Sequence, residues 1–218
     1  MTDKTKLKIC RWCGADAELI RAHIIPEAFH ALSPGADKRV AILSPDDSKF
    51  TRVRQAGITD PGILCGPCDR LLGKLDEFAL TVFRSPPAES DAVQVGPAKG
   101  YDLHCSDIPR AQRFLLSVLW RASVSSDSTF ELINLPLPDL DRIRKLILSE
   151  QIPDEGEFEF LAIRYDKPYF EGGFLPPWTS KAGTVPVYNL ALPCYQFMIR
   201  INRGAAIFPR SIVFRHTR

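Results

Sequence analysis

The 218-residue chain has no apolar run close to the roughly 18 residues that a membrane-spanning helix needs. It also has no apolar segment near its N-terminus: the first eight residues, Met1 to Lys8, are mostly polar or basic, so no secretion signal is recognised. Internal repeats and low-complexity tracts are absent from the sequence too. We therefore expect a globular protein of the cytoplasm with no membrane partner.

An excess of charge of one sign is also missing. The sequence has 28 Lys+Arg against 26 Asp+Glu, a net charge of +2, which is too balanced to indicate a nucleic-acid partner by itself. Basic residues gather near both ends, among them Lys6, Lys8 and Arg11 and the arginines after position 199. If the two ends of the chain lie close together in the fold, their basic residues form a positively charged surface that can bind along a phosphate backbone. Scattered, solvated charge is the alternative.

What the chain does have is ordinary globular composition, with 45% hydrophobic residues, arranged in regions of different texture. Residues 1–90 predict short strands and loops followed by a helix at about 69–83, which ends before Pro86-Pro87. Residues 91–218 predict a helical segment (100–150), with one helix at about 137–149, and a β-rich part (155–218). Strands are expected at 158–163, 185–191, 195–201 and 212–214. The predicted fold class is α+β, with the last two segments packed as one unit.

Two C-x-x-C pairs, Cys10/Cys13 and Cys65/Cys68, are the most specific signal in the sequence. Two thiolates at this spacing can bind one tetrahedral ion, and two pairs complete a closed four-cysteine zinc site. The 51 residues between the pairs exceed the usual gap. Closing the longer loop costs only about 1 kcal/mol, whereas structural zinc supplies an apparent ~10–16 kcal/mol. We therefore predict one structural zinc ion.

A redox role is the main alternative for the second pair. Cys65-Gly66-Pro67-Cys68 is also the thioredoxin tetrapeptide, which would make the protein a thiol oxidoreductase. That fold needs a continuous buried strand before the pair, and here Asp60-Pro61-Gly62 interrupts it. Disulfides are not expected without a secretion signal. Cys105 and Cys194 have no partner spacing and are expected to be buried thiols.

A histidine motif follows ten residues after Cys13: Ala22-His23-Ile24-Ile25-Pro26. The order C-x-x-C, H-I-I-P, C-x-x-C and helix resembles the zinc-containing branch of the HNH endonucleases, and a group of bacterial proteins given that label. The later segment from Arg113 to Ser123 is part of the same resemblance. It implies a zinc-stapled ββα-metal (HNH-like) module, followed by helices and a C-terminal antiparallel β-rich part.

The resemblance also implies roles for single residues. His23 matches the general base that activates water. Asp69 matches a helix position that the family usually fills with Asn or His, where an aspartate could ligate a catalytic Mg²⁺ or Mn²⁺. Phosphodiester hydrolysis needs a proton acceptor and a cation on the phosphate, and histidine has a suitable ordinary pKa. An idle histidine beside the zinc, and a helix cap at position 69, are the structural alternatives.

The sequence departs from the family at two positions. Ala22 stands where an acidic ligand is common, and Gly73 stands at a ligand position on the helix. His30 and Glu27 are the candidates to complete the catalytic metal site. Arg70 and Lys74 either contact phosphate or form a solvated helix face. Arg121 is expected to pair with a helix acid or with phosphate.

Three functions follow as hypotheses. The first is an HNH-like endonuclease that hydrolyses DNA with His23 as general base. The second is an inactive, zinc-dependent module that binds nucleic acid or a protein partner, and the third is a thiol oxidoreductase using Cys65 and Cys68. A protein partner or a homo-oligomer is compatible with all three.

Overall fold

The computed structural model describes residues 8–30, 39–42, 52–55, 57–84, 92–95, 98–101, 108–151, 157–165, 173–192, 195–201, 204 and 214–216. Only the backbone is described for residues 30, 39–41, 52–55, 92–95, 98–101, 164, 173–174 and 214–216. Lys6, Cys105 and Cys194 lie outside the described residues. Among those residues, no helix has the length and apolarity to cross a membrane.

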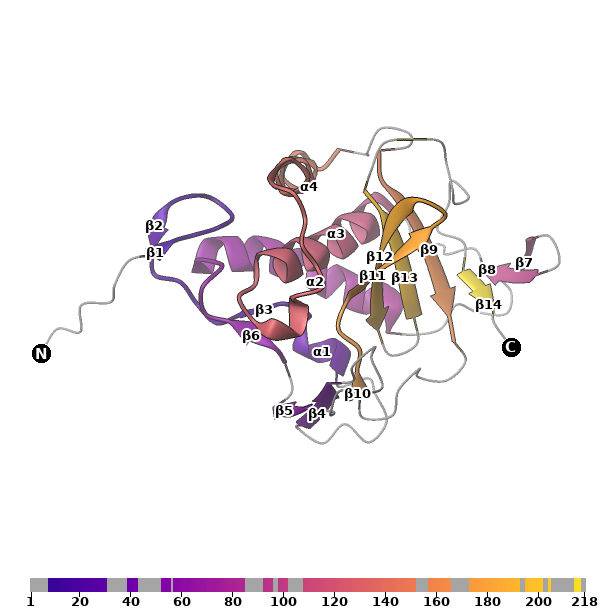
Figure 1. Ribbon diagram of the computed structural model, residues 1–218, viewed down its shortest axis with the longest axis horizontal. Helices are drawn as coiled ribbons and strands as arrows, with labels where there is room; N and C mark the ends of the chain where they lie inside the picture. The colour runs from indigo at the N-terminus through magenta and orange to yellow at the C-terminus, as the bar shows by residue number, and fades with distance from the viewer. Residues whose placement is uncertain are drawn as a thin grey trace, which may run out of the picture.

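The N-terminal region consists of short strand pairs and two helices (Figure 1). Strands β1 (Lys8–Ile9) and β2 (Asp16–Ala17) pair antiparallel, as do β3 (Ala22–His23) and β6 (Thr59–Asp60). A short helix, α1 (Glu27–His30), follows β3 directly and was not predicted. Strands β4 (Arg39–Ile42) and β5 (Arg52–Gln55) form a further antiparallel pair, to which β10 (Gly173–Phe174) adds in parallel.

Helix α2 (Gly66–Phe83) is the long helix predicted after the second cysteine pair, and it begins three residues earlier than expected. Pro67 explains the early start, because proline suits the first turn, where backbone N–H groups have no helical partner. Leu72, Leu75, Ala79 and Phe83 form its buried face. Their spacing of three and four residues is what makes the helix amphipathic.

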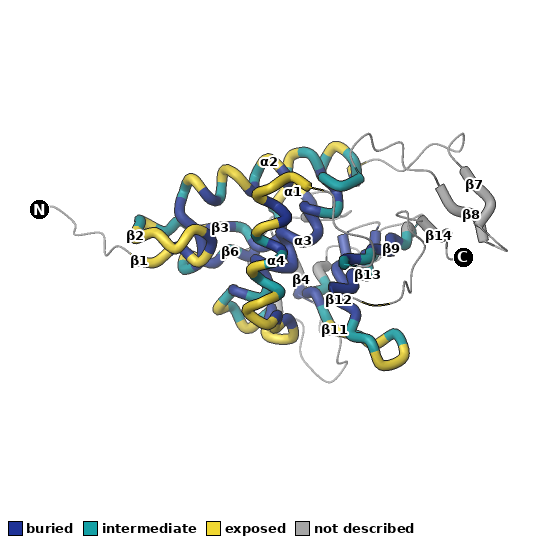
Figure 2. The backbone as a smooth tube through the Cα atoms, turned by 90° about the horizontal axis from the view of Figure 1, so that it is seen from above, coloured by how far each residue is buried: buried dark blue, intermediate teal, exposed yellow. Residues whose placement is uncertain are grey.

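Two more helices confirm the predicted helical segment. Helix α3 (Ile108–Val124) is buried along nearly its whole length, and it packs between α2 and α4 (Leu137–Ser149). A short 3₁₀ turn, η2 (Ser128–Phe130), lies between α3 and α4. Figure 2 shows the buried backbone concentrated where these helices meet the sheet.

The C-terminal part is a mostly antiparallel sheet with the strand order β11-β12-β13-β9-β14-β8-β7. Three expected strands correspond to β9 (Glu159–Arg164), β12 (Val185–Leu192) and β13 (Tyr195–Arg200), whereas β14 (Phe214–His216) shares only Phe214 with the strand expected at 212–214. Strands β7 (Ala92–Val95), β8 (Ala98–Tyr101) and β11 (Trp178–Ala182) were not predicted. The α+β class and the antiparallel C-terminal part are thus confirmed; the exception is β14, which pairs with β9 in parallel.

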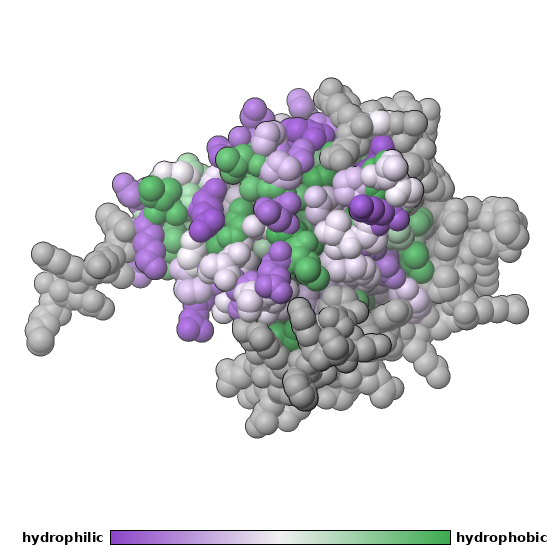
Figure 3. Space-filling view, viewed as in Figure 1, coloured by the Kyte–Doolittle hydropathy of each residue, from purple (hydrophilic) through white to green (hydrophobic). Residues whose placement is uncertain are grey.

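One hydrophobic core includes residues from all these parts. Trp12 from the N-terminal strands, Leu72 from α2, Phe114 from α3, Ile143 from α4 and Phe197 from β13 all belong to it. Apolar side chains reach the surface in small separate groups on the face in Figure 3. In Figure 1, β1 and β14 lie at opposite ends of the molecule. Lys6 and most of the arginines after position 199 lie outside the described residues, so convergence of the two basic segments stays a prediction.

Candidate metal centre and the histidine beside it

The four cysteines of the two C-x-x-C pairs converge. The Sγ atoms of Cys10, Cys13, Cys65 and Cys68 all lie within 4.8 Å of one another, and those of Cys13 and Cys65 are 3.9 Å apart. Sulfurs on a tetrahedral zinc ion, at Zn–S distances of about 2.3 Å, are separated by about 3.8 Å. Four soft donors in this arrangement can hold a metal ion such as zinc.

The first pair lies in a tight turn between β1 and β2. The Gly14 N–H donates to the Cys10 carbonyl at 2.8 Å, and the Cys10 N–H donates to the Ala15 carbonyl at 2.9 Å. Gly14 has φ +76°, and a Cβ there would meet nothing within 4 Å. The glycine is therefore needed for its backbone conformation and not for space. We call residues 8–17 the cysteine turn.

The second pair lies at the start of α2, where Cys65 is the N-cap residue and Cys68 is in the first turn. The Cys65 N–H donates to the Cys10 Sγ at 3.4 Å, and the Arg11 N–H donates to the Ile63 carbonyl at 3.0 Å. These backbone contacts join the cysteine turn to α2. The positive end of a helix dipole also stabilises anionic sulfur.

Burial and hydrogen bonding affect the thiols of Cys10, Cys65 and Cys68 differently. Burial raises the pKa of Cys65, and burial with the neighbouring sulfurs raises the pKa of Cys68. Burial acts in the same direction on Cys10, but backbone hydrogen bonds from Cys13, Cys65 and Trp12 outweigh it and lower its pKa to about 7. A bound cation would favour the thiolate form at all four positions.

His23 lies on β3, and its surroundings fix its position. The His23 Nε2 is 3.8 Å from the Glu27 Oε2, and the side chains of His23 and Glu27 are 39% and 61% exposed. Gly57 has φ +83°, and a Cβ there would lie 2.8 Å from the His23 Nε2. Antiparallel pairing with Thr59 holds the His23 backbone. The imidazole is thus ordered and still reachable from solvent.

Arg121 holds the same strand through a hydrogen bond to its backbone. Its guanidinium donates to the His23 carbonyl at 3.0 Å, and to both Asp76 carboxylate oxygens at 2.9 and 2.7 Å. It also donates to the Ser117 carbonyl and to the Ser117 hydroxyl, each at 3.3 Å. Arg121 is 1% exposed, so this buried charge is compensated by a bidentate ion pair. The predicted pairing of Arg121 with a helix acid is confirmed.

Asp69 lies half-buried in the first turns of α2. Burial raises the pKa of its carboxyl; Asp76 acts in the same direction, and Arg121 and His23 act in the opposite direction. The N-cap residue of α2, Cys65, makes no side-chain capping hydrogen bond, and Asp69 is the acidic residue of the first turn. The fold places His23 near enough to act electrostatically on the Asp69 carboxyl, although the two residues are 46 positions apart in the sequence.

The other candidate residues are placed as follows. Glu27 is the first residue of α1, and of His30, the last residue of α1, only the backbone is described. Within the described part of the chain, the four cysteines are the single group of three or more side chains positioned to share an ion. The residues proposed for basic contacts, Lys8, Arg11, Arg70 and Lys74, are all exposed.

The two residues that depart from the HNH pattern, Ala22 and Gly73, differ in the space around them. Ala22 is completely buried, so an acidic side chain at that position would need room in the core. Gly73 has space beside it, since a Cβ would meet nothing within 4 Å. Asp76, further along α2, is held by Arg121.

Sequence reasoning missed Gly57 and Asp60. Asp60 is 2% exposed and accepts from the Gly62 N–H at 2.7 Å, the Ser126 N–H at 2.7 Å, and the Ser125 and Ser126 hydroxyls at 2.9 and 3.0 Å. The Asp-Pro-Gly order indicates a turn closed by the aspartate side chain, which would have identified the first contact. No local signal indicates the contact of Gly57 with His23.

Comparison of the chain with protein-family models, curated proteins and solved structures finds no match. The site is therefore interpreted from its own geometry.

Proposed function

We propose that the four cysteines hold one structural zinc ion, and that the chain is an HNH-like endonuclease that hydrolyses phosphodiester bonds in DNA. The observation that carries the proposal is the solvent-reachable imidazole of His23. It lies on the antiparallel pair β3–β6, the chain continues from β6 to the second cysteine pair and α2, and His23 acts electrostatically on the Asp69 carboxyl. Two strands and a following helix are the arrangement that the HNH resemblance implies.

His23 acts as the general base in this proposal. Its Nε2 takes the proton of the attacking water, and the Glu27 carboxylate at 3.8 Å stabilises the resulting imidazolium. The hydrogen bond from Arg121 to the His23 carbonyl holds the strand from which the ring projects. Gly57 leaves room for the ring, because any side chain at that position would collide with Nε2.

Mg²⁺ or Mn²⁺ is the proposed catalytic cofactor. Such ions are commonly held by one or two carboxylates together with substrate phosphates, so a cage of three protein ligands is not required. Asp69 fits as a ligand because, in the described part of the chain, its carboxylate has no hydrogen bond or ion pair. Glu27 and His30 are the candidates for a second ligand. The bound ion would neutralise charge on the scissile phosphate.

Cleavage of plasmid DNA with Mg²⁺ or Mn²⁺ tests the nuclease proposal. We expect His23→Ala to lower the rate about 10²–10⁴-fold, the usual contribution of a general base. Asp69→Asn should raise the Mn²⁺ concentration needed for half-maximal activity. The control is Glu77→Gln, an exposed acid on the same helix, which should retain wild-type activity. Equal cleavage by wild type and His23→Ala would exclude His23 as the base.

A binding module without turnover is the second candidate. Buried Ala22, the absent side chain at Gly73 and the pairing of Asp76 with Arg121 all favour it, because they leave few ligands for a catalytic ion. This function predicts that DNA binds with a steep salt dependence, and that no cleavage occurs with either metal.

Metal analysis separates both candidates from a thiol oxidoreductase. One zinc ion per chain would occupy Cys65 and Cys68, and so would leave no free dithiol for disulfide exchange. Purified protein without zinc, with a reactive thiol at position 65, would instead favour redox chemistry.

A further inference from the structure

Of the four clustered cysteines, Cys13 is the one that solvent reaches. Cys10, Cys65 and Cys68 are 0%, 4% and 9% exposed, whereas Cys13 is exposed. The cysteine turn is also open beside it, because no atom of the described residues lies within 4 Å of where a Cβ of Gly14 would be. Thiolates react with oxidants according to their exposure. An oxidant in solution therefore meets the cluster at Cys13.

Cys65 is placed to react next. Its Sγ is 3.9 Å from the Cys13 Sγ, and a disulfide requires about 2.05 Å, so the two sulfurs must approach by about 2 Å. Cys65 is the N-cap of α2, with φ −85° and ψ 162°, so its side chain is not restricted by a preceding helical turn. The Cys10 Sγ, by contrast, is completely buried and accepts from the Cys65 N–H at 3.4 Å. Cys13 and Cys65 are therefore the pair best placed to join.

We infer that Cys13 is a site of reversible oxidation by peroxides, and that its oxidation closes a Cys13–Cys65 disulfide and releases the zinc ion. The Cys13 thiolate attacks one oxygen of hydrogen peroxide, the O–O bond breaks, and a sulfenic acid and hydroxide form. The Cys65 thiolate then attacks the sulfenic sulfur, an S–S bond forms, and a second hydroxide leaves. Two electrons thus pass from the two thiolates to the peroxide. Cys10 and Cys68 alone do not complete a tetrahedral zinc site.

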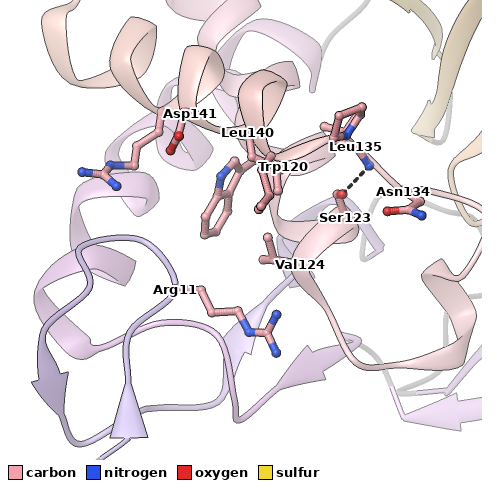
Figure 4. Close-up of a pocket in the computed structure, with 11 residues that line it drawn as sticks. Arg11, Trp120, Ser123, Val124, Asn134, Leu135, Leu140 and Asp141 are labelled. Carbon is pink, nitrogen blue, oxygen red and sulfur yellow. Dashed lines mark hydrogen bonds between the residues drawn. The ribbon is translucent and has the colours of Figure 1, made fainter.

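Oxidation of Cys13 affects the core through the neighbouring Trp12. Trp12 packs edge to face on Trp120, with ring centroids 4.7 Å apart and planes at 80°. The Trp120 indole is 2% exposed, and it lies between Arg11 of the cysteine turn and Leu140 of α4 (Figure 4). Loss of the ion and movement of the Cys13 sulfur loosen this contact, so tryptophan fluorescence reports the state of the cysteine pair. The inference rests on the proposed zinc ion and not on DNA cleavage.

Treatment of the zinc-loaded full chain with a small excess of hydrogen peroxide tests this inference. A chromophoric chelator measures zinc release, and mass spectrometry of alkylated peptides identifies the disulfide. We expect zinc release, a Cys13–Cys65 disulfide and a red shift of tryptophan fluorescence, all reversed by a dithiol reductant together with zinc. Cys13→His keeps a nitrogen ligand for zinc but has no exposed thiolate, so its zinc release should be at least about tenfold slower. The control is the double variant Cys105→Ser with Cys194→Ser, outside the cluster, which should release zinc at the wild-type rate.

Three results would overturn the inference: zinc retained by the oxidised wild type, a disulfide within either C-x-x-C pair in place of Cys13–Cys65, or equally fast zinc release by wild type and Cys13→His. Disulfide mapping of the wild type needs no variant, so it decides even if Cys13→His does not hold zinc. Elemental analysis before oxidation keeps the proposals separate. Absence of zinc at that stage would refute the proposed zinc ion, whereas zinc that is present and not released would overturn only this inference.

Discussion

Two separate constraints act on Gly57. Its φ of +83° lies in a region that L-residues with a side chain rarely adopt, and a Cβ would approach the His23 Nε2 to 2.8 Å. Gly183 shares the first constraint, with φ +64°, but a Cβ there would meet nothing within 4 Å. Comparing alanine at the two positions therefore separates backbone strain from displacement of the imidazole.

Gly57→Ala should displace the His23 ring and lower DNA cleavage about 100-fold, since shifts of about 1 Å at a reacting group cost that much. Gly183→Ala should lose about 1–2 kcal/mol of stability and keep wild-type activity. The measurements are initial cleavage rates and the His23 imidazole signals in NMR spectra. Unchanged imidazole signals in Gly57→Ala would show that the predicted collision is relieved elsewhere.

Asp60 makes stability depend on pH. Burial raises its pKa, but the hydrogen bonds from Ser126, Gly62 and Ser125 outweigh burial and hold the pKa below its ordinary value. A carboxyl whose pKa is lower in the folded than in the unfolded state binds protons more weakly when folded. The contribution of Asp60 to the stability of the fold is therefore present above the unfolded-state pKa of about 3.9, and it is lost as the pH falls through the folded-state pKa.

Asp60→Asn should cost roughly 1–3 kcal/mol at neutral pH, because it removes the charged acceptor. The difference in unfolding free energy between wild type and variant should stay constant above about pH 5 and shrink at lower pH. Urea unfolding between pH 3 and pH 7 measures the loss of stability at neutral pH and its change at lower pH. Ser126→Ala, which removes one hydroxyl donor, should show a smaller pH dependence than wild type. A difference that grows as the pH falls would contradict this account.

At the scale of the secondary-structure elements, Arg121 connects its own helix α3 with α2 and β3. From α3 its guanidinium reaches Asp76 on α2 and the carbonyl of His23 on β3, while the side chain itself is 1% exposed. Charge buried at this depth is tolerated only when it is paired, and removing one partner leaves the other uncompensated. Arg121 therefore contributes, together with the shared hydrophobic core, to the relative placement of α2, α3 and β3.

Arg121→Leu should destabilise the protein by about 3–5 kcal/mol, because Asp76 remains as an unpaired acid. Replacing both residues, Arg121→Leu with Asp76→Leu, should recover part of this loss. Arg70→Ala, an exposed arginine on α2, should change stability by less than about 0.5 kcal/mol. Chemical denaturation of the four proteins gives these values. A double variant less stable than Arg121→Leu would mean that the uncompensated charge of Asp76 is not the main cause of the lost stability.

At the scale of the whole molecule, the cysteine cluster is part of the main core. Cys10, Cys65 and Cys68 belong to the same hydrophobic cluster as Phe114 and Phe197, and Trp12 of the cysteine turn packs on Trp120 of α3. Loss of a metal from the cluster would therefore loosen the packing on α3 as well as the turn itself.

If the cluster holds the proposed zinc ion, removing it with a strong chelator should lower the melting temperature by at least about 10 °C, since each kcal/mol shifts it by about 2–4 °C in a protein of this size. Elemental analysis measures the metal content before and after removal, and calorimetry measures the melting temperature of both forms. Adding one equivalent of zinc should restore the original transition, and Cys13→Ser should resemble the chelated protein. An unchanged transition in protein known to be metal-free would mean that the cluster stabilises nothing.

Local sequence was enough to predict much of this chain. Two C-x-x-C pairs indicated a four-cysteine site, because two thiolates at that spacing can bind one tetrahedral ion. Apolar periodicity predicted α4 over the residues that form it, and alternating or continuous apolar residues predicted β9, β12 and β13. Such patterns are local consequences of helix and strand geometry, so they can be recognised without a partner.

Only the tertiary structure decided which distant groups meet. The contacts of Gly57 with His23, of Arg121 with Asp76 and the His23 carbonyl, and of Asp60 with Ser125 and Ser126 join segments with no shared periodicity. Strand β8 depends in the same way on its pairing with β14, which lies far along the chain. A buried charge or a short strand is stable only with its partner in place, and the partner's position follows from packing of the whole core.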